Sequence, residues 1–490
     1  MGSMRFACPS DRITEELVQQ AYMSGFERIP WLTQARNVDG DLIIQRSVAE
    51  SGVLHIPWRV EGHGQIVLST STLMERDEPY YLPLELARGK IGQTRNQLAD
   101  WQMIGLVASE PVLAKLSESL DLFAQAAVID HASTRSAQLA QKALHAALDA
   151  ANLLAACYTE QALAVRHRSA PKLPTLLGAN LGLSPLDEPT AREYLAAFNA
   201  ANVPMAWKEI ETSEGNYGWE LTDRQIQWCR ENRLTVCAGP LVQLDQRSIP
   251  DWLYLYEDDF ESVLSFASEF VQAAVERYRG QVDVWHAAGR INTADLLSLS
   301  EEDKVKLAAR MVHLTRSLDQ NAPALVAFDQ PWAEYLSRRQ MDFPPMHFAD
   351  ALVRANLGLA GLVLEMNMGY HPGGTLLRDP LEISRQLDCW SQLGVPLCLS
   401  ICAPSSAHDD PLAQRQTKVL SANWTAKSQQ VWAARCVSLL LAKPYVQGIL
   451  WNHLRDSEPH DFPHAGLFDL RRQPKPALRQ LASLRQAHLR

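Results

Sequence analysis

The chain has 490 residues, which is too long for one ordinary domain but fits an eight-fold barrel of about 250–300 residues with a further region before it. Hydrophobic residues make up 47% of the chain, an ordinary share for a globular protein, and no apolar stretch reaches the ~18 residues of a membrane span. The formal net charge of −10 argues against nucleic acids and anionic membranes as partners, because both need a clustered basic face. Neutral glycans are not excluded.

The eight cysteines are scattered and include no Cys-x-x-Cys pair, so we expect free, mostly buried thiols. Cys398 and Cys402 would share one face of a strand but lie too far apart for a good chelate. No metal site and no cofactor are therefore predicted. Residues 1–5 contain no apolar signal segment, so a cytoplasmic protein is the default expectation.

Residues 4–80 are predicted to form a small β-rich domain. Strand-like composition over 41–44 and 64–69 alternates with turn sequences at 37–40 and 62–64.

Residues 81–170 change to helical periodicity, with helices expected at about 84–106, 111–127 and 133–166. A helical hairpin or linker between two domains is the simpler interpretation. Because the last of these helices is long, a coiled-coil contact that makes a homo-oligomer is kept as an alternative.

Residues 171–490 are predicted to form a (β/α)8 barrel of the α/β class. A polar segment with prolines, 166–174, precedes eight short apolar strands that alternate with amphipathic helices, which is typical of a closed parallel barrel. The expected strands are 175–181, 203–210, 234–239, 282–286, 324–328, 360–367, 395–401 and 446–452. Helices are expected between them, for example at 258–279, 301–319 and 425–442.

Several motifs between about 175 and 480 resemble one known family. They are Met205–Glu211 (MAWKEIE), Ile249–Trp252 (IPDW), Val282–His286 (VDVWH), Leu467–Asp469 (LFD) and Gln473–Ala477 (QPKPA). They resemble the M-K-W-E-x-I-E, L-P-x-W, W-D-V-V-N-E and L-F-D…Q-P-K-P-A patterns of the family 10 glycoside hydrolases, which are retaining endo-β-1,4-xylanases. The resemblance implies a (β/α)8 barrel, a carbohydrate ligand and hydrolysis by two glutamates.

The resemblance breaks at the catalytic positions. The family's acid/base glutamate falls on Ala287, the asparagine before it on His286, and its nucleophile on Ile401. Retaining hydrolysis needs two carboxyl groups about 5–5.5 Å apart, which alanine and isoleucine cannot supply. We therefore predict no xylan hydrolysis by the family's mechanism, and any activity must depend on other residues.

Polar and aromatic residues near the predicted C-terminal strand ends are the candidates for a remodelled site, because these ends form the functional face of such barrels. The predicted catalytic residues are Glu365, His286, Asp329 and Asp456. The predicted carbohydrate-binding residues are Trp207, Lys208, Arg290, Asn367, Tyr370, His371, Trp451, Asn452 and His453. The aromatic rings among them can stack on the apolar faces of sugars. For most of these residues taken singly, a structural hydrogen bond or ion pair is the simpler interpretation.

Glu365 is the strongest of these candidates. It lies in the apolar segment 361–368, where the family pattern resembles G-I-G-L-Q-M-H and has glutamine. A buried carboxylate must be paired or become protonated. Because Lys208 and Arg290 are expected on the same face, a structural ion pair and a catalytic role both stay open.

Three hypotheses follow from the sequence. The preferred one is a glycosidase-type enzyme whose carboxylates have moved to new positions. The second is a non-catalytic carbohydrate-binding or scaffold protein, and the third is an interaction protein that oligomerises through its helices. A separation of about 5–10 Å between the nearest carboxyl groups of an open cleft would favour catalysis.

Overall fold

The computed structural model describes residues 2–9, 12–130, 133–341, 343–414, 417–421 and 423–490. The chain divides into two compact units. The first contains Met1–Val165, Trp332–Gln340 and Thr375–Leu387, and the second contains Arg166–Pro331, Met341–Gly374 and Asp388–Arg490. Among the described residues, no helix combines the length and the apolar composition that crossing a membrane requires.

The first unit begins with two small sheets. One has the strand order β3-β4-β1-β7 and consists of β1 (Gly2–Ala7), β3 (Thr33–Val38), β4 (Asp41–Arg46) and β7 (Tyr80–Tyr81). The other has the order β2-β5-β6 and consists of β2 (Tyr22–Ser24), β5 (Val53–Val60) and β6 (Gly64–Ser69); α1 (Glu15–Gln20) precedes β2. Side-chain alternation buries Met4 and Phe6 of β1 with Leu42 and Ile44 of β4 in one core. The predicted β-rich region is confirmed.

Three helices follow the sheets in the chain. They are α2 (Leu82–Met103), α3 (Glu110–Ala127) and α4 (Thr134–Ser169). Ala147 and Ala151 lie four residues apart on one face of α4 and pack with Ile91 of α2 and Val112 of α3. Small side chains on this face let the helices approach closely, and the predicted helical region is confirmed.

The second unit is a barrel of parallel strands, and the predicted fold class is confirmed. The strand order is β8-β20-β18-β16-β15-β14-β12-β9. A bridge between Asn180 and Asn202 joins the two ends of this order, and the Leu181 N–H donates to the Asn202 carbonyl at 3.0 Å. The strands are β8 (Leu176–Ala179), β9 (Ala200–Val203), β12 (Thr235–Ala238), β14 (Val284–Gly289), β15 (Ala324–Asp329), β16 (Leu359–Asn367), β18 (Leu397–Cys402) and β20 (Val446–Trp451).

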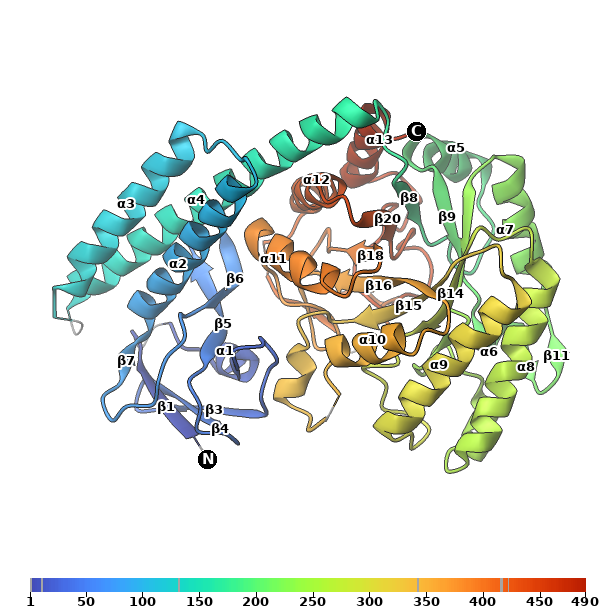
Figure 1. The fold of residues 1–490 in the computed structure, drawn as a ribbon, viewed down its shortest axis with the longest axis horizontal. Helices are drawn as coiled ribbons and strands as arrows, with labels where there is room; N and C mark the ends of the chain where they lie inside the picture. Colours follow the sequence, from blue (N-terminus) through green and yellow to red (C-terminus); the bar gives the residue numbers. More distant parts are fainter. Residues whose placement is uncertain (1, 10–11, 131–132, 342, 415–416, 422) are drawn as a thin grey trace. The chain divides into compact units, whose positions relative to one another are not determined.

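Helices alternate with these strands along the chain. Figure 1 shows α8 and α9 side by side outside the strands, and these two helices contact each other. The longer helices are α5 (Glu188–Ala197), α7 (Glu220–Glu231), α8 (Phe260–Tyr278), α9 (Glu301–Leu318), α10 (Pro345–Arg354), α11 (Pro380–Ser391), α12 (Ala426–Ala442) and α13 (Pro476–His488). Shorter elements are α6 (Trp207–Ile210), the 3-10 turns Asp251–Tyr256 and Glu334–Ser337, β10 (Glu211–Ser213), β11 (Asn216–Tyr217), β13 (Val242–Gln243), β17 (Tyr370–His371) and β19 (Lys418–Val419).

The prediction of a second barrel strand at 203–210 is wrong. That strand, β9, ends at Val203, and the chain then enters the short helix α6. The apolar run after Val203 has the composition of a strand, but Pro204 has no backbone N–H to donate to a neighbouring strand. The true strand contains two alanines and an asparagine, which strand propensity does not identify.

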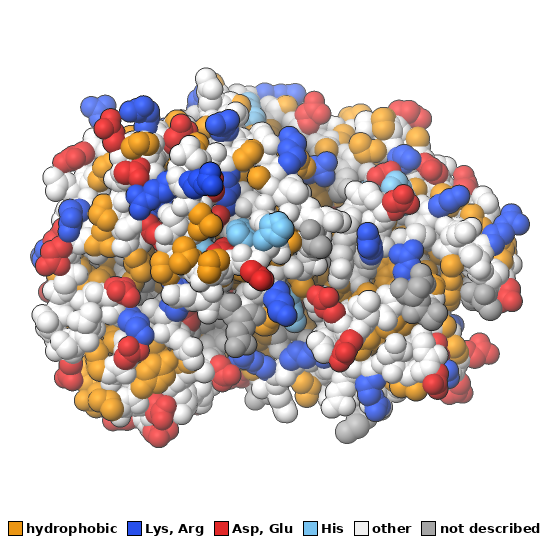
Figure 2. Space-filling view, turned by 180° about the vertical axis from the view of Figure 1, so that it is seen from behind, with side chains coloured by type: hydrophobic (Ala, Val, Ile, Leu, Met, Phe, Trp, Pro, Cys, Tyr) orange, Lys and Arg blue, Asp and Glu red, His pale blue; other side chains and the backbone are white. Residues whose placement is uncertain are grey.

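Charged side chains are spread over the surface. Figure 2 shows basic and acidic side chains interspersed over one face of the molecule, without a stripe of one sign along it. The net charge of −10 is therefore not concentrated on that face.

Candidate functional site

A cavity of about 180 Å³ lies among the C-terminal ends of the barrel strands. Its wall includes His286 from β14, Val363 and Glu365 from β16, Ser400 from β18 and Trp451 from β20. Alternation along β16 brings Val363 and Glu365 to the same face, inside the barrel. Asn202 of β9 and Gln243 of β13 also line it, and residues of the loops that follow the strands complete the wall, among them Asn180, Asp245, Arg247, Arg290, Asn452, His453, Glu458, His460 and Asp461.

A buried ionic cluster occupies one side of this cavity. Arg290 follows β14, and its Nε donates to Glu365 Oε2 at 3.0 Å. Its Nη1 donates to Asp245 Oδ2 at 3.0 Å and to Asp461 Oδ2 at 2.6 Å. Arg247 adds a second guanidinium, with Nη1 2.6 Å from Asp461 Oδ1. The buried guanidinium of Arg290 therefore holds three carboxylates that come from separate parts of the chain.

The carboxylates of this cluster stabilise the positive charge of Arg290. Burial acts to lower the pKa of Arg290, but the carboxylates of Glu365, Asp461 and Asp245 outweigh burial and raise that pKa well above its ordinary value. A guanidinium held in this way stays charged, and removing it would leave three carboxylates close together in a buried place without their shared cation.

The spacing of the carboxylates is short, but their environment does not suit acid catalysis. Asp245 and Asp461 both contact one Arg290 nitrogen, which keeps the two contacting oxygens within about 6 Å of each other. Retaining glycosidases also hold two carboxyl groups close together, about 5–5.5 Å apart. A guanidinium stabilises the ionised form of a carboxylate, however, whereas one member of a catalytic pair must carry a proton. Both carboxylates of the pair are therefore held by a cation, unlike the proton-donating member of a catalytic pair.

His286 lines the cavity as a buried titratable residue, and no ion pair with it is found among the described residues. It is buried, and its Nε2 has no hydrogen-bond partner in the structure. Burial lowers the pKa of His286 to about 4, so its ring is neutral near pH 7. A Cβ at Gly239, whose φ is +123°, would lie 2.4 Å from the His286 carbonyl oxygen. Glycine at that position lets the neighbouring strand approach His286 closely.

Two amides and a thiol form a neutral cluster beside the charged one. Asn452 Nδ2 donates to Asn367 Oδ1 at 2.9 Å, and Cys402 Sγ contacts the same oxygen at 3.1 Å. Burial raises the pKa of the Cys402 thiol well above its ordinary value, so this thiol is not a nucleophile at neutral pH. Asn452 lines the cavity, whereas Asn367 is fully buried and positions it.

Two histidines close the cavity on the side of the loop after β20. The rings of His453 and His460 have centroids 4.4 Å apart. Burial lowers the pKa of His453 well below its ordinary value. Burial acts in the same direction on His460, but the 2.9 Å contact between its Nε2 and Asp410 Oδ2 outweighs burial and raises the pKa of His460. Two adjacent rings therefore differ in charge at mildly acidic pH.

Two of the predicted catalytic carboxylates are outside the cavity wall. Asp329 ends β15 beside Glu365 in the sheet register, and its backbone N–H and carbonyl pair with the Asn292 side chain. Asp456 forms a buried ion pair with Lys475 and accepts the Gly466 N–H at 2.7 Å. Neither residue lines the cavity with His286.

Several predicted carbohydrate-binding residues also lie outside the cavity wall. Trp207 is buried, with its Nε1 donating to Glu211 at 2.6 Å. Lys208 is paired with Asp251, and the buried Tyr370 hydroxyl donates to the Pro463 carbonyl at 2.9 Å. His371 lies in the short strand β17, half-buried and outside the cavity wall. The structure does bring Arg290, Trp451, Asn452 and His453 to the cavity with Glu365 and His286.

Sequence reasoning missed Arg247 and Asp461. Arg247 follows the short strand β13, and Asp461 lies in the loop after β20, far from any recognisable strand end. Their partner, Arg290, was a candidate, but nothing in the spacing of the three residues indicates that they meet. The dense run of ionisable residues from 453 to 464 is the one sequence signal that pointed to this loop.

Comparison with known proteins gives similarity to glycoside hydrolases over part of the chain. Residues 184–291 match the sequence model of Glycosyl hydrolase family 10, a segment that runs from before α5 through β14 and includes His286 and Arg290. The class defined by the fold and this match is a (β/α)8 barrel with a segment similar to family 10.

Solved xylanase structures are similar to the chain at low identity. Xylanase 10B from Thermotoga maritima is 18% identical, with 65% of this chain and 97% of that chain covered and a TM-score of 0.49. Xylanase 10B from Thermotoga petrophila RKU-1 in complex with xylobiose is 17% identical, with 66% and 97% covered and a TM-score of 0.49. Xylanase B from Clostridium stercorarium F9 is 15% identical, with 65% and 98% covered and a TM-score of 0.48.

Proposed function

We propose that the barrel binds a polysaccharide or oligosaccharide through the cavity at the C-terminal ends of its strands. The observation that carries this proposal is the composition of the wall, in which the carboxylates fixed by Arg290 and the Asn452 amide line one cavity with the largely buried Trp451. Sugar hydroxyls bind planar polar groups of this kind, and the apolar face of a pyranose packs on an aromatic ring. The partial match to a carbohydrate-active family supports the same ligand class.

The size of the cavity favours a short part of the ligand. Pockets for drug-sized ligands have volumes of roughly 300–1,000 Å³. A cavity of about 180 Å³ is smaller and takes about one sugar residue, with the rest of the chain outside it. We infer that one end of the carbohydrate enters the cavity.

The chemistry of the wall favours binding over hydrolysis by two glutamates. Asp245, Asp461 and Glu365 all contact Arg290, and Asp456 is paired with Lys475. A retaining glycosidase needs a carboxyl group that holds a proton and another that attacks carbon. Carboxylates held by cations serve neither role well, whereas they accept hydrogen bonds from hydroxyl groups.

A glycosidase-type hydrolase with a remodelled site is the second candidate. The observation that favours it is His286, whose neutral ring and unpartnered Nε2 share the cavity wall with Glu365. A neutral imidazole can accept a proton from a nucleophile, as a general base does. In this hypothesis His286 moves the proton and Glu365 orients the substrate.

One experiment separates the two candidates. The purified protein is incubated with a panel of oligosaccharides and polysaccharides, and both binding and the release of new reducing ends are measured. Binding without release supports the binding protein, and release that disappears in both Glu365→Gln and His286→Gln supports the enzyme. A matched control is Glu276→Gln, which makes the same change on the exposed side of α8.

A further inference from the structure

A cluster of two histidines and an aspartate lies in the first unit, apart from the barrel cavity. His63 occupies the tight turn between β5 and β6, and His145 and Asp149 lie on α4. One nitrogen of each histidine and one oxygen of the aspartate all lie within 4.8 Å of one another. His63 Nε2 is 3.1 Å from Asp149 Oδ1, and His145 Nδ1 is 3.5 Å from Asp149 Oδ2.

We propose that His63, His145 and Asp149 bind a divalent transition-metal ion, with Zn²⁺ as the preferred ion. Imidazole nitrogen and carboxylate oxygen are the ligand types that Zn²⁺ takes in proteins, at about 2.0–2.2 Å. In a tetrahedral site such bond lengths place neighbouring ligand atoms about 3.3–3.5 Å apart. Each histidine nitrogen already lies near this spacing from one oxygen of Asp149, His63 from Oδ1 and His145 from Oδ2, and one carboxylate oxygen lies within 4.8 Å of both nitrogens.

The local fold explains why the three side chains meet. His145 and Asp149 are four residues apart on α4, so they share one face of the helix. His63 is held over that face by the turn from β5 to β6, where Gly62 has a φ of +76°. A Cβ on Gly62 would lie 3.5 Å from His145 Nε2, so the turn and the helix are in direct contact. All three side chains are partly exposed, which leaves them accessible to ions in solution.

Asn152 lies where a metal-binding histidine needs a partner. Its side-chain nitrogen is 3.3 Å from His63 Nδ1, and its Oδ1 is buried without a hydrogen-bond partner. Turning this amide by 180° would let Oδ1 accept the His63 Nδ1–H. That hydrogen bond would leave the lone pair on His63 Nε2 for the metal and would fix the ring, as the outer partners of metal-binding histidines do.

Lys115 competes with a metal ion for the aspartate. Its Nζ lies 3.7 Å from Asp149 Oδ2, and it also contacts Glu118 at 2.9 Å. Because Lys115 has Glu118 as an alternative partner, it can leave Asp149 when an ion binds. Removing Lys115 should therefore strengthen metal binding.

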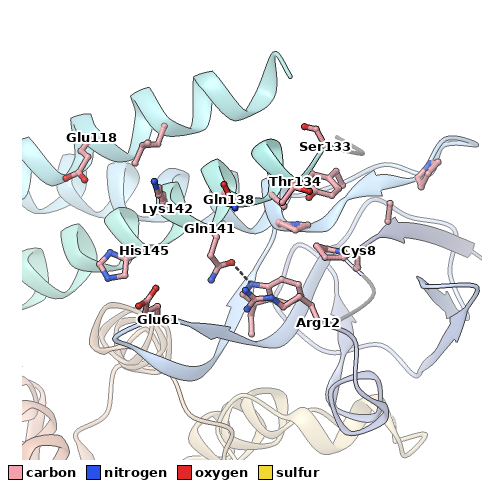
Figure 3. A pocket seen from close by; sticks show the side chains of 18 residues that line it. Cys8, Arg12, Glu61, Glu118, Ser133, Thr134, Gln138, Gln141, Lys142 and His145 are labelled. Carbon is pink, nitrogen blue, oxygen red and sulfur yellow. Dashed lines mark hydrogen bonds between the residues drawn. The ribbon is translucent and has the colours of Figure 1, made fainter. Parts of the chain in front are cut away.

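Three protein ligands leave a fourth position for water or a ligand group. His145 also lines a cavity of about 1270 Å³ in the first unit, and Figure 3 labels it with Glu61 and Lys142 among the side chains around that cavity. The metal would fasten the β5–β6 turn to α4 at this place. No metal site was predicted from the sequence, where only the cysteines were considered as ligands; His63 lies far from His145 and Asp149 in the chain.

The test is a zinc titration of the full-length protein after removal of bound metal with a chelator. Competition with a chromophoric chelator is expected to show one Zn²⁺ per chain that depends on the cluster. His63→Ala and Asp149→Ala should weaken this site at least about 100-fold, and Asn152→Ala about 10-fold. Lys115→Ala should bind several-fold more tightly. The control is His167→Ala, which removes a histidine from another close pair, with His488, in the second unit.

Two results would overturn the proposal. One is wild-type protein that binds no Zn²⁺ at micromolar concentrations. The other is equal binding by wild type, His63→Ala, Asn152→Ala and His167→Ala, which would assign the bound zinc to other groups. If His63→Ala fails to fold, Asn152→Ala and Lys115→Ala still give opposite expected shifts, and the absence of both shifts contradicts the site.

Discussion

The two ends of the barrel bury different kinds of side chain. The end described above holds Arg290 with three carboxylates, all in contact within a cavity wall. The opposite end has a cavity of about 360 Å³ lined largely by apolar residues, among them Leu176, Val284, Leu325, Ala360, Cys398 and Val446. Apolar burial stabilises the fold directly, whereas a buried ionic cluster often contributes little to stability compared with apolar packing. The contrast separates a charged end, where we propose that the ligand binds, from an apolar end that contributes to stability.

The largest expected effect is the loss of Arg290. Arg290→Met keeps much of the side-chain volume but leaves Glu365, Asp245 and Asp461 close together without their shared cation. We expect the free energy of unfolding to fall by about 3–5 kcal/mol, measured by chemical denaturation. Arg247→Ala, at the more exposed edge of the cluster, should lower it by about 1 kcal/mol or less. Equal effects of the two variants would show that the cluster is not the buried network described here.

A substitution at the apolar end of the barrel should lower the free energy of unfolding without changing carbohydrate affinity. Val446 is fully buried and lines the apolar cavity. Val446→Ala should lower the free energy of unfolding by about 2 kcal/mol through lost packing. Carbohydrate affinity, measured by calorimetry under folding conditions, should stay at the wild-type value. A large loss of affinity in this variant would mean that the two ends are not separate in function.

The lowered pKa of His286 should make the stability of the protein depend on pH. Its pKa is about 4 in the folded protein and near 6.5 in the unfolded chain. As the pH falls below the unfolded value, the unfolded state binds a proton that the folded state does not, so stability is lost. Between about pH 6.5 and pH 5 this loss amounts to about 2 kcal/mol.

The measurement compares wild type with His286→Gln by denaturation at several pH values. The variant should lose less stability than wild type over this range. His313→Gln, which removes an exposed histidine of α9, should keep the wild-type dependence. If His286→Gln also keeps the wild-type pH dependence of stability, the His286 ring is not neutral in the folded protein.

The smallest expected effect concerns the neutral amide cluster. Asn452→Ala removes one hydrogen-bonding group from the cavity wall and the 2.9 Å bond to Asn367. We expect carbohydrate affinity to weaken by about 1 kcal/mol, or about five-fold, in a calorimetric titration. An affinity equal to wild type would place the ligand away from Asn452.

The fold was predictable because hydrophobic periodicity survives in most strands. β15 and β16 are continuous apolar runs that a buried parallel strand produces, and they were located to within a residue or two. β9 was misplaced because its alanines and asparagine have weak strand propensity and its apolar neighbours follow Pro204. Pairing with β12 on one side and with the end of β8 on the other makes this segment a strand, and a single sequence does not show that pairing.

The residues of the site were predictable only where the position of a residue on or next to a strand determines the face on which its side chain lies. Glu365 and Arg290 were expected on one face, and the structure pairs them at 3.0 Å. Lys208, expected on the same face, pairs with Asp251 instead because it belongs to a helix and not a strand. Asp461 comes from a loop whose path depends on contacts far away in the chain. The homo-oligomer through residues 81–170 stays a prediction, which sedimentation of the full-length protein would test.

The most direct test of the account is carbohydrate binding by wild type and Glu365→Gln. Wild type should bind a member of the glycan panel, and Glu365→Gln, with Asp245 and Asp461 still on Arg290, should stay folded. Its affinity should fall about 10-fold to 100-fold, because one charged hydrogen bond is lost. Glu276→Gln should bind as wild type does. Folded wild-type protein that binds no glycan, or binding that Glu365→Gln leaves unchanged, would contradict the central claim.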